Sequence, residues 1–165
     1  MELARFWKHL VMTPWRAARC FPAATMDRLQ REIAEQESRH RGEVAFFVEA
    51  ELDTALLWQG LPVRERAKQV FAAEGIWNTE ENNGVLVYVL LAERKVEIVA
   101  DRGVDRRVEA GTWQAIVDVM DAHFRAGRFE QGAIEGLQAV GTVLQRHFPA
   151  DGAGRNELAD RPILR

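Results

Sequence analysis

Three short stretches of the chain combine apolar residues with the spacing of β-strands. Their sequences are EVAFFVE (43–49), GVLVYVLL (84–91) and VEIVA (96–100). The first two are apolar at both odd and even positions, which is typical of strands covered on both faces of a sheet. Glu97 interrupts the third stretch, so we expect that strand to lie at a more exposed edge.

Apolar residues at helical spacing predict four helices around these strands. The helices cover about residues 22–39, 62–75, 112–126 and 131–147. The helix at 62–75 lies between the first two strands, and a crossover of this kind makes two strands parallel. The polar segment 92–95 is short enough for a hairpin turn, so the third strand returns antiparallel to the second. The sequence therefore predicts an α/β fold with a small mixed sheet.

The first 20 residues carry an amphipathic helical pattern of their own, which Pro14 interrupts. The apolar positions are Leu3, Phe6, Trp7, Leu10 and Val11. The charged residues Glu2, Arg5, Lys8, Arg16 and Arg19 sum to +3. This balance suits an anionic membrane surface, so the segment from Met1 to Arg19 is a candidate for membrane or protein binding. Alternatively, the apolar stripe packs on the domain itself or on a second copy of the chain.

The other end of the chain has no such pattern. Beyond Pro149 the sequence ADGAGRNELADRPILR is polar, contains glycine and is aperiodic, so we expect a flexible tail. The chain thus divides into an amphipathic segment (1–20), one α/β domain (21–149) and a tail (150–165).

Composition narrows the class of protein. The 165 residues are 47% hydrophobic and 28% charged, which suits one globular domain. The net charge of −3 argues against binding of nucleic acid. Cys20 is the single cysteine and cannot form an internal disulfide. With no apolar run long enough for a signal peptide or a spanning helix, we expect a cytoplasmic protein, peripheral to the membrane if the first helix binds lipid.

The hairpin places two polar runs at one edge of the predicted sheet. If 92–95 is the turn, Leu91 lies opposite Val96, and Leu86 lies opposite Asp101. The parallel first strand brings residues 39–43 to the same edge. The edge then holds the oxygen-bearing side chains of Glu80, Glu81, Asn82, Asn83, Asp101 and Asp105.

Oxygen ligands of this kind suit Ca²⁺ or Mg²⁺, whereas the chain has no Cys/His cluster for zinc. The alternative is that these residues are solvated turn formers, because Asn-Gly favours positive φ angles. Both interpretations stay open at this point.

Other catalytic patterns are missing from the sequence. Cys20 lacks the Cys-x5-Arg signature of thiol phosphatases, and the chain contains neither a G-x-S-x-G motif nor a P-loop. The four histidines are scattered; only His40 falls near the polar edge, and we expect it at the surface.

Residues 28–148 resemble the TPM domain family. The resemblance lies in GEVAFFVE, in ERAKQVFAAEGIWNTEENNGVLVYVLL, in AERKVEIVADRGVD and in AHFRAGRFEQGAIEGLQAVGTVL. It implies a three-layer α/β/α sandwich, in which helices cover both faces of a mixed sheet of about four strands. More loosely, it implies calcium binding and acid-phosphatase activity at an acidic pocket by the sheet edge.

The chain departs from the family pattern in two places. Asn82 stands where Asp is common before Asn-Gly, which removes a charge from any metal site, and Asp101-Arg102-Gly103 replaces a glycine-x-glycine turn. Many relatives also carry a signal peptide and a membrane helix that this sequence lacks.

Two functions follow as hypotheses. The first is an accessory or interaction module. The second is a divalent-metal-dependent, acid-phosphatase-like hydrolase. The candidate metal ligands of the second are Glu81, Asn82, Asn83, Asp101 and Asp105, and its candidate catalytic residues are Asp101 and Arg102.

Overall fold

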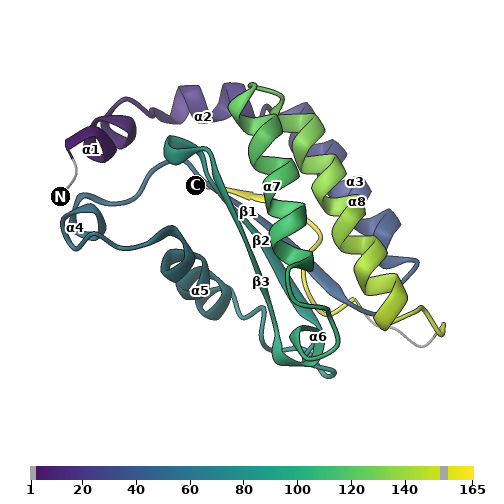
Figure 1. Ribbon diagram of the computed structural model, residues 1–165. Coiled ribbons are helices and arrows are strands. Elements are labelled where there is room, and N and C mark those ends of the chain that lie inside the picture. Colours follow the sequence, from purple (N-terminus) through teal and green to yellow (C-terminus); the bar gives the residue numbers. More distant parts are fainter. Residues whose placement is uncertain (1–2, 153–155) are drawn as a thin grey trace.

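The computed structural model describes residues 3–152 and 156–165 and has three layers (Figure 1). The middle layer is a four-stranded sheet in the order β3-β2-β1-β4. Its strands are β1 (Glu43–Glu49), β2 (Gly84–Leu90), β3 (Lys95–Ala100) and β4 (Ile163–Leu164). Strand β1 is parallel to β2 and β4, whereas β3 is antiparallel to β2. The predicted three-layer α/β/α fold with a mixed sheet is confirmed.

Helices cover both faces of the sheet (Figure 1). One face packs against α3 (Ala23–Glu37), α7 (Thr112–Arg125) and α8 (Phe129–His147), and the other packs against α5 (Val63–Ala73). Strand β2 contributes to both cores, because Val85, Val87 and Val89 face α7 and α8 while Leu86, Tyr88 and Leu90 face α5. All seven residues of β2 are buried, as its continuous apolar sequence predicts.

The remaining elements are short. They are α1 (Leu3–Leu10), α2 (Pro14–Cys20), α4 (Thr54–Trp58), the 3-10 turn η1 (Leu91–Glu93) and α6 (Arg102–Asp105). Pro14 does not simply end the first helix, because it begins α2, where Thr13 Oγ1 accepts a hydrogen bond from Arg16 N. Proline suits this position, because the N–H group that it lacks would have no hydrogen-bond partner in the first turn of a helix. In the described residues, no helix is long and apolar enough to cross a membrane.

The predicted hairpin register is wrong by two residues. We expected Val96 opposite Leu91, but Val96 pairs with Val89. The turn occupies 91–94 instead of 92–95, because η1 tightens the chain and Arg94 adopts a left-handed conformation (φ 50°). Since the side-chain period of a strand is two, this shift leaves every residue of β3 on its expected face.

The expectation of a flexible tail is wrong for its last three residues. Ile163 and Leu164 pair with Phe47 and Val48 as strand β4. Arg165 N donates to Val48 O (2.9 Å), and Ala50 N donates to Arg165 O (2.7 Å). A two-residue strand is too short to give a periodic signal, but β1 gains partners for backbone groups that would otherwise be unpaired.

We predict that deleting residues 162–165 destabilises the domain. Each lost backbone hydrogen bond of this kind contributes about 1 kcal/mol, so the midpoint of thermal unfolding should fall by roughly 5 °C. Arg161→Ala is the matched control, since Arg161 is exposed and precedes the strand. Equal unfolding midpoints for the truncated and intact chains would show that β4 contributes nothing to stability.

Candidate functional site

The polar edge lies where β1 and β2 begin and β3 ends. Asn83 O accepts a hydrogen bond from Glu43 N (3.2 Å), and Asp101 N donates to Gly84 O (2.8 Å). In the observed register, Asp101 lies beside Gly84 at the very end of the sheet, and not opposite Leu86 as predicted. Asn82, Asn83 and Asp101 come together at this end, as the sequence predicts.

Tight backbone packing at this edge requires particular residue types. Asn82 has a φ of 52°, in the left-handed region that asparagine tolerates better than most residues. A Cβ on Gly103 would lie 2.5 Å from the carbonyl oxygens of Glu81 and Asn82, and one on Gly84 would lie 2.1 Å from Ile76 O. Both glycines are thus fixed by close approach of backbone to backbone.

Asn83 and Asp101 each keep one oxygen that has no partner among the described residues. Asn83 is 2% exposed, and its Nδ2 donates to Arg41 O (2.6 Å) while Oδ1 makes no hydrogen bond. Asp101 Oδ1 accepts from Arg102 N (2.7 Å) and caps α6, whereas the buried Oδ2 makes no hydrogen bond. Two oxygens thus remain free to accept a donor or a cation.

The other candidate ligands have different surroundings. Glu81 forms an ion pair with Arg41 (2.7 Å), and Asn82 Oδ1 accepts from Arg102 Nε (3.1 Å). The side chain of Asp105 is exposed. Within residues 3–152 and 156–165, no group of three His, Cys, Asp or Glu side chains is placed to hold a metal ion. A cation here would bind Asn83 Oδ1 and Asp101 Oδ2 directly, whereas Asn82 and Glu81 would first have to leave Arg102 and Arg41.

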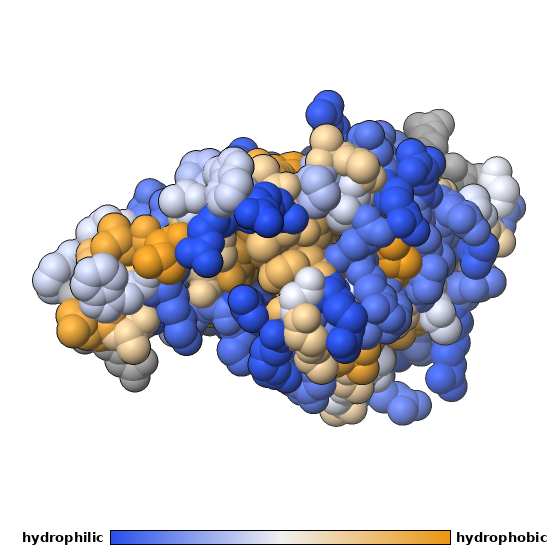
Figure 2. All heavy atoms as spheres, turned by 90° about the horizontal axis from the view of Figure 1, so that it is seen from above, coloured by the Kyte–Doolittle hydropathy of each residue, from blue (hydrophilic) through white to orange (hydrophobic). Residues whose placement is uncertain are grey.

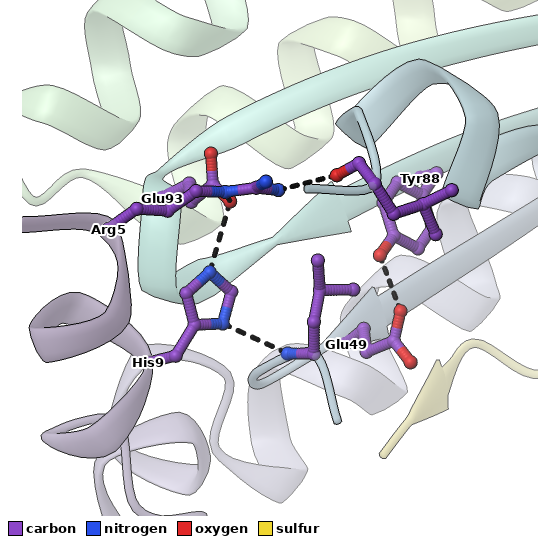
Figure 3. Close-up of polar contacts among 7 residues, drawn as sticks. Arg5, His9, Glu49, Tyr88 and Glu93 are labelled. Carbon is purple, nitrogen blue, oxygen red and sulfur yellow. Dashed lines mark hydrogen bonds and ion pairs between the residues drawn. The ribbon is translucent and has the colours of Figure 1, made fainter. Parts of the chain in front are cut away.

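A second polar cluster lies at the opposite end of the sheet, where it attaches α1 to the domain (Figure 3). Arg5 Nε donates to Glu93 Oε1 (2.7 Å), and Arg5 Nη2 donates to Leu61 O (2.7 Å). His9, which is 1% exposed, places Nε2 3.0 Å from the same Glu93 oxygen and accepts Leu52 N at Nδ1 (3.0 Å). Because Nδ1 accepts, Nε2 carries the proton and donates to Glu93.

We call the contacts of Arg5 and His9 with the domain the α1 anchor, and Glu93 lies at its centre. Burial alone would raise the pKa of Glu93, but hydrogen bonds from His9 and Arg5, together with the charge of Arg5, outweigh burial and hold that pKa below its usual 4.5. Glu93 is therefore ionised at neutral pH, and the charge that Arg5 adds to the amino-terminal segment is compensated inside the domain.

A neighbouring contact ties the two central strands to α5. Tyr88 OH donates to Glu49 Oε2 (2.5 Å), and Arg66 binds both oxygens of Glu49 (2.9 and 2.6 Å). Burial, reinforced by the hydrogen bond to Glu49, raises the pKa of Tyr88. The phenol therefore stays protonated and holds the carboxylate in place.

The anchored helix turns its apolar stripe to solvent. Five large apolar side chains of the amino-terminal segment are exposed, namely Leu3, Trp7, Leu10, Val11 and Trp15. Figure 2 shows apolar residues gathered at the end of the molecule where α1 lies. Lys8 is exposed nearby, and the Arg19 guanidinium lies 4.7 Å from the ring centroid of Trp15. Phe6, which belongs to the same stripe, is half-buried and packs against the core that contains Phe47 and Tyr88. The stripe therefore packs on its own domain only in part, and its other large side chains face solvent.

The prediction for His40 is wrong. We expected it at the surface, but it is 3% exposed, at the junction of α3 and β1. Its backbone forms an isolated bridge with Pro149, a residue more than a hundred positions away in the sequence. The sequence around His40 could not predict its burial, because the partner lies so far along the chain.

A protein-family model of the TPM domain matches residues 16–143. The chain belongs to the TPM domain family. Among curated proteins, none matches the chain.

Solved structures agree with the TPM fold. The NMR structure of the BA42 protein from the psychrophilic bacterium Bizionia argentinensis has a TM-score of 0.78 and 25% identity, over 88% of this chain and 95% of that one. The N-terminal domain of a protein from P. gingivalis has a TM-score of 0.62 and 24% identity, over 79% and 80% of the two chains. The N-terminal domain of cg2496 from Corynebacterium glutamicum has a TM-score of 0.54 and 11% identity, over 74% and 72%.

The TPM match includes the polar edge but leaves α1 outside it. Both residues that turn α1 toward the domain, Arg5 and His9, precede the matched region, whereas their partner Glu93 lies within it. The anchor thus joins the region that the TPM model matches to a helix that precedes that region.

We predict that Glu93→Gln loosens α1 without unfolding the TPM domain. Losing the ionised acceptor of Arg5 and His9 should cost about 2 kcal/mol at pH 7. Since the fold lowers the pKa of Glu93, its stabilisation is present above pH 4.5 and disappears as the pH falls, so the difference between variant and parent should shrink in acid. Chemical denaturation and hydrogen exchange of the α1 amides measure the two effects.

Glu97→Gln is the matched control for this experiment. Glu97 lies on the same hairpin and pairs with Arg64 at 3.3 Å, but as an exposed pair it should contribute little. If the two variants lose the same stability, or if α1 exchanges no faster in Glu93→Gln, Glu93 is not the anchor.

Proposed function

We propose that this TPM-domain protein is a non-catalytic accessory module that docks on an anionic membrane surface through α1 and α2. The observation that carries the proposal is the exposed apolar stripe on a helix that Arg5 and His9 fix to the domain. A cytoplasmic location with peripheral attachment to the membrane belongs to the same proposal.

The chemistry of the stripe supports a lipid surface as the partner. Trp7 is 55% exposed and Trp15 is 66% exposed, and tryptophan is the residue that prefers the boundary between headgroups and acyl chains. Lys8, Arg16 and Arg19 flank the stripe, and each basic residue near an anionic bilayer contributes about 1 kcal/mol. The combination of apolar and basic residues on short helices is typical of interfacial segments.

Anchoring makes this surface more effective. A free helix of eight residues is marginal in water, so it would have to be ordered at the moment of binding. The contacts of His9 with Glu93 and Leu52 order α1 in advance, so the ordering cost is met by folding and not by the membrane. Trp58 of α4 is also exposed, in the segment between Leu52 and Leu61, the two residues whose backbones bind α1.

We predict that replacing both Trp7 and Trp15 with alanine weakens binding to phosphatidylserine-containing vesicles at least tenfold. Both rings are exposed, so the fold should survive their loss. Binding of the parent chain should also fall as salt is raised, because screening weakens the basic contacts. Vesicle co-sedimentation at low and high salt measures both effects.

Trp77→Ala is the control, since Trp77 is equally exposed but follows α5, away from α1 and α2. Binding that is lost equally in Trp77→Ala, or that persists in the double variant, contradicts docking through the amino-terminal helices.

A second candidate function is supported by the two unpartnered oxygens, Asn83 Oδ1 and Asp101 Oδ2. In this proposal, Ca²⁺ or Mg²⁺ binds at the polar edge and polarises a phosphate ester, which makes the chain a metal-dependent hydrolase. The ligands would be Glu81, Asn82, Asn83, Asp101 and Asp105. Arg102 would leave Asn82 to bind the phosphate, and Glu81 would leave Arg41 to reach the cation.

We predict that any phosphatase activity disappears in excess chelator and falls about 10- to 100-fold in Asp101→Asn, because losing a ligand or its support has effects of that size. Asparagine also caps helices, so α6 should survive the substitution. Hydrolysis of a generic phosphate ester at saturating Mg²⁺ or Ca²⁺ measures the activity. Asp105→Asn tests the more exposed ligand. Activity that resists chelation, or that is unimpaired in Asp101→Asn, rules out this mechanism.

A further inference from the structure

A cavity of about 300 Å³ lies beside the polar edge, between the end of α3, the start of β1 and the residues before β4. Its polar lining comes from residues far apart in the sequence, among them Glu37, Ser38, His40, Glu43, Asn156 and Asp160. None of these is a candidate ligand of the polar edge. Arg41, which also lines the cavity, connects the two places through its ion pair with Glu81.

Two buried polar groups at this cavity have unused hydrogen-bonding capacity. Both ring nitrogens of His40 are buried, and neither makes a well-formed hydrogen bond within the described chain, although the Gly42 backbone favours the protonated ring. Glu37 Oε1 accepts from Val44 N (2.9 Å), and Glu37 Oε2 has no partner among the described residues apart from the Asp160 carboxyl group beside it. Buried polar atoms are almost always paired, so unpaired ones that surround a cavity mark the place of a polar ligand.

The charge around the cavity indicates the sign of that ligand. Four carboxylic acids line it, namely Glu37, Glu43, Asp151 and Asp160. Of the lining residues that the structure describes, Arg41 alone carries a cationic side chain, and it binds Glu81 (2.7 Å) and Asp151 (3.3 Å). The surplus of acid favours a cation.

We propose that this cavity binds the ammonium group of a small organic amine through Glu37, His40 and Asp160. An ammonium group presents three N–H donors, and a carboxylate oxygen and a neutral imidazole nitrogen both accept such donors. Burial lowers the pKa of His40 to about 4, opposed in part by the Gly42 backbone, so the ring is neutral at pH 7 and one nitrogen accepts.

An organic cation fits the cavity better than a metal ion does. No three acidic or histidine side chains of the described residues are placed to hold a metal. The volume corresponds to roughly ten water molecules at about 30 Å³ each, which exceeds the space that a bare ion fills. A free diamine and the lysine side chain of a peptide share the required chemistry.

Glu37 couples amine binding to pH. Burial, with smaller effects from Glu43 and Asp160, raises the pKa of Glu37 to about 8, while the Val44 amide opposes the shift. Glu37 is thus mostly protonated at pH 7 and must lose its proton to pair with an ammonium group. The ionised fraction rises from about a tenth at pH 7 to about nine-tenths at pH 9, so affinity should increase about tenfold.

Calorimetric titration of the full chain with putrescine tests the proposal. We expect about tenfold tighter binding at pH 9 than at pH 7, and release of close to one proton per amine at pH 7, read from buffers of different ionisation enthalpy. In Glu37→Gln, binding should weaken and lose its pH dependence; glutamine can still accept the Val44 amide, and a thermal melt checks the fold. Glu65→Gln, an exposed change on α5, is the control.

Titration with Nα-acetyl-lysine amide separates the two sources of the amine. Tighter binding of this compound than of putrescine supports a lysine of a protein partner, and the reverse supports a free diamine. The absence of binding heat for both compounds at both pH values overturns the proposal, as does putrescine binding that is unchanged in Glu37→Gln.

Discussion

Parallel pairing of β1 with β2 determines where every candidate site of this protein lies. Residues 43–49 pair with 84–90 without a break, and both strands are covered on both faces. Because the strands run in the same direction, the segments that precede them meet at one end of the sheet and the segments that follow them meet at the other. The polar edge and the acidic cavity occupy the first end, and Glu93 with the α1 anchor occupies the second (Figure 1).

This separation matters for function. A membrane that contacts α1 and α2 would leave the polar edge at the far end of the sheet, free to bind a small molecule or a protein. The shared TPM fold supplies the rigid sheet between the two ends. The α1 helix, which lies outside the matched region and is held by the ion pair of Arg5 with Glu93, forms the exposed apolar surface at one end.

Patterns within 5 to 20 residues predicted most of the fold, because the strands and large helices bury continuous apolar stripes. The features that could not be predicted depend on contacts between distant residues or on very short elements. Strand β4 has two residues, which are too few to show a periodic pattern. The 3-10 turn η1 shifted the pairing register of the hairpin, and no single residue type predicts such a turn. The anchor joins His9 to Glu93 and Leu52, and each of these residues is unremarkable in its local sequence.

The candidate site was predicted in place but not in detail. Alternation and parallel order brought Asn83 and Asp101 to one edge, since both properties follow from strand geometry. Strand geometry did not predict how the side chains pair. Glu81 forms an ion pair with Arg41, and Arg102 donates to Asn82, so two of the side-chain oxygens that the sequence offers to a metal are bound within the chain. The cavity beside His40 and Glu37 is lined in part by Asn156 and Asp160, which lie in a segment without a recognisable pattern.

Hydrogen exchange of the intact chain with and without phosphatidylserine vesicles tests the central claim, that the anchored amino-terminal helices are the docking surface. The account predicts slower exchange at residues 3–20 on addition of vesicles and unchanged exchange at 81–84 and 101–105, at the other end of the sheet. Unchanged exchange at 3–20, or slowing confined to the polar edge, would contradict it.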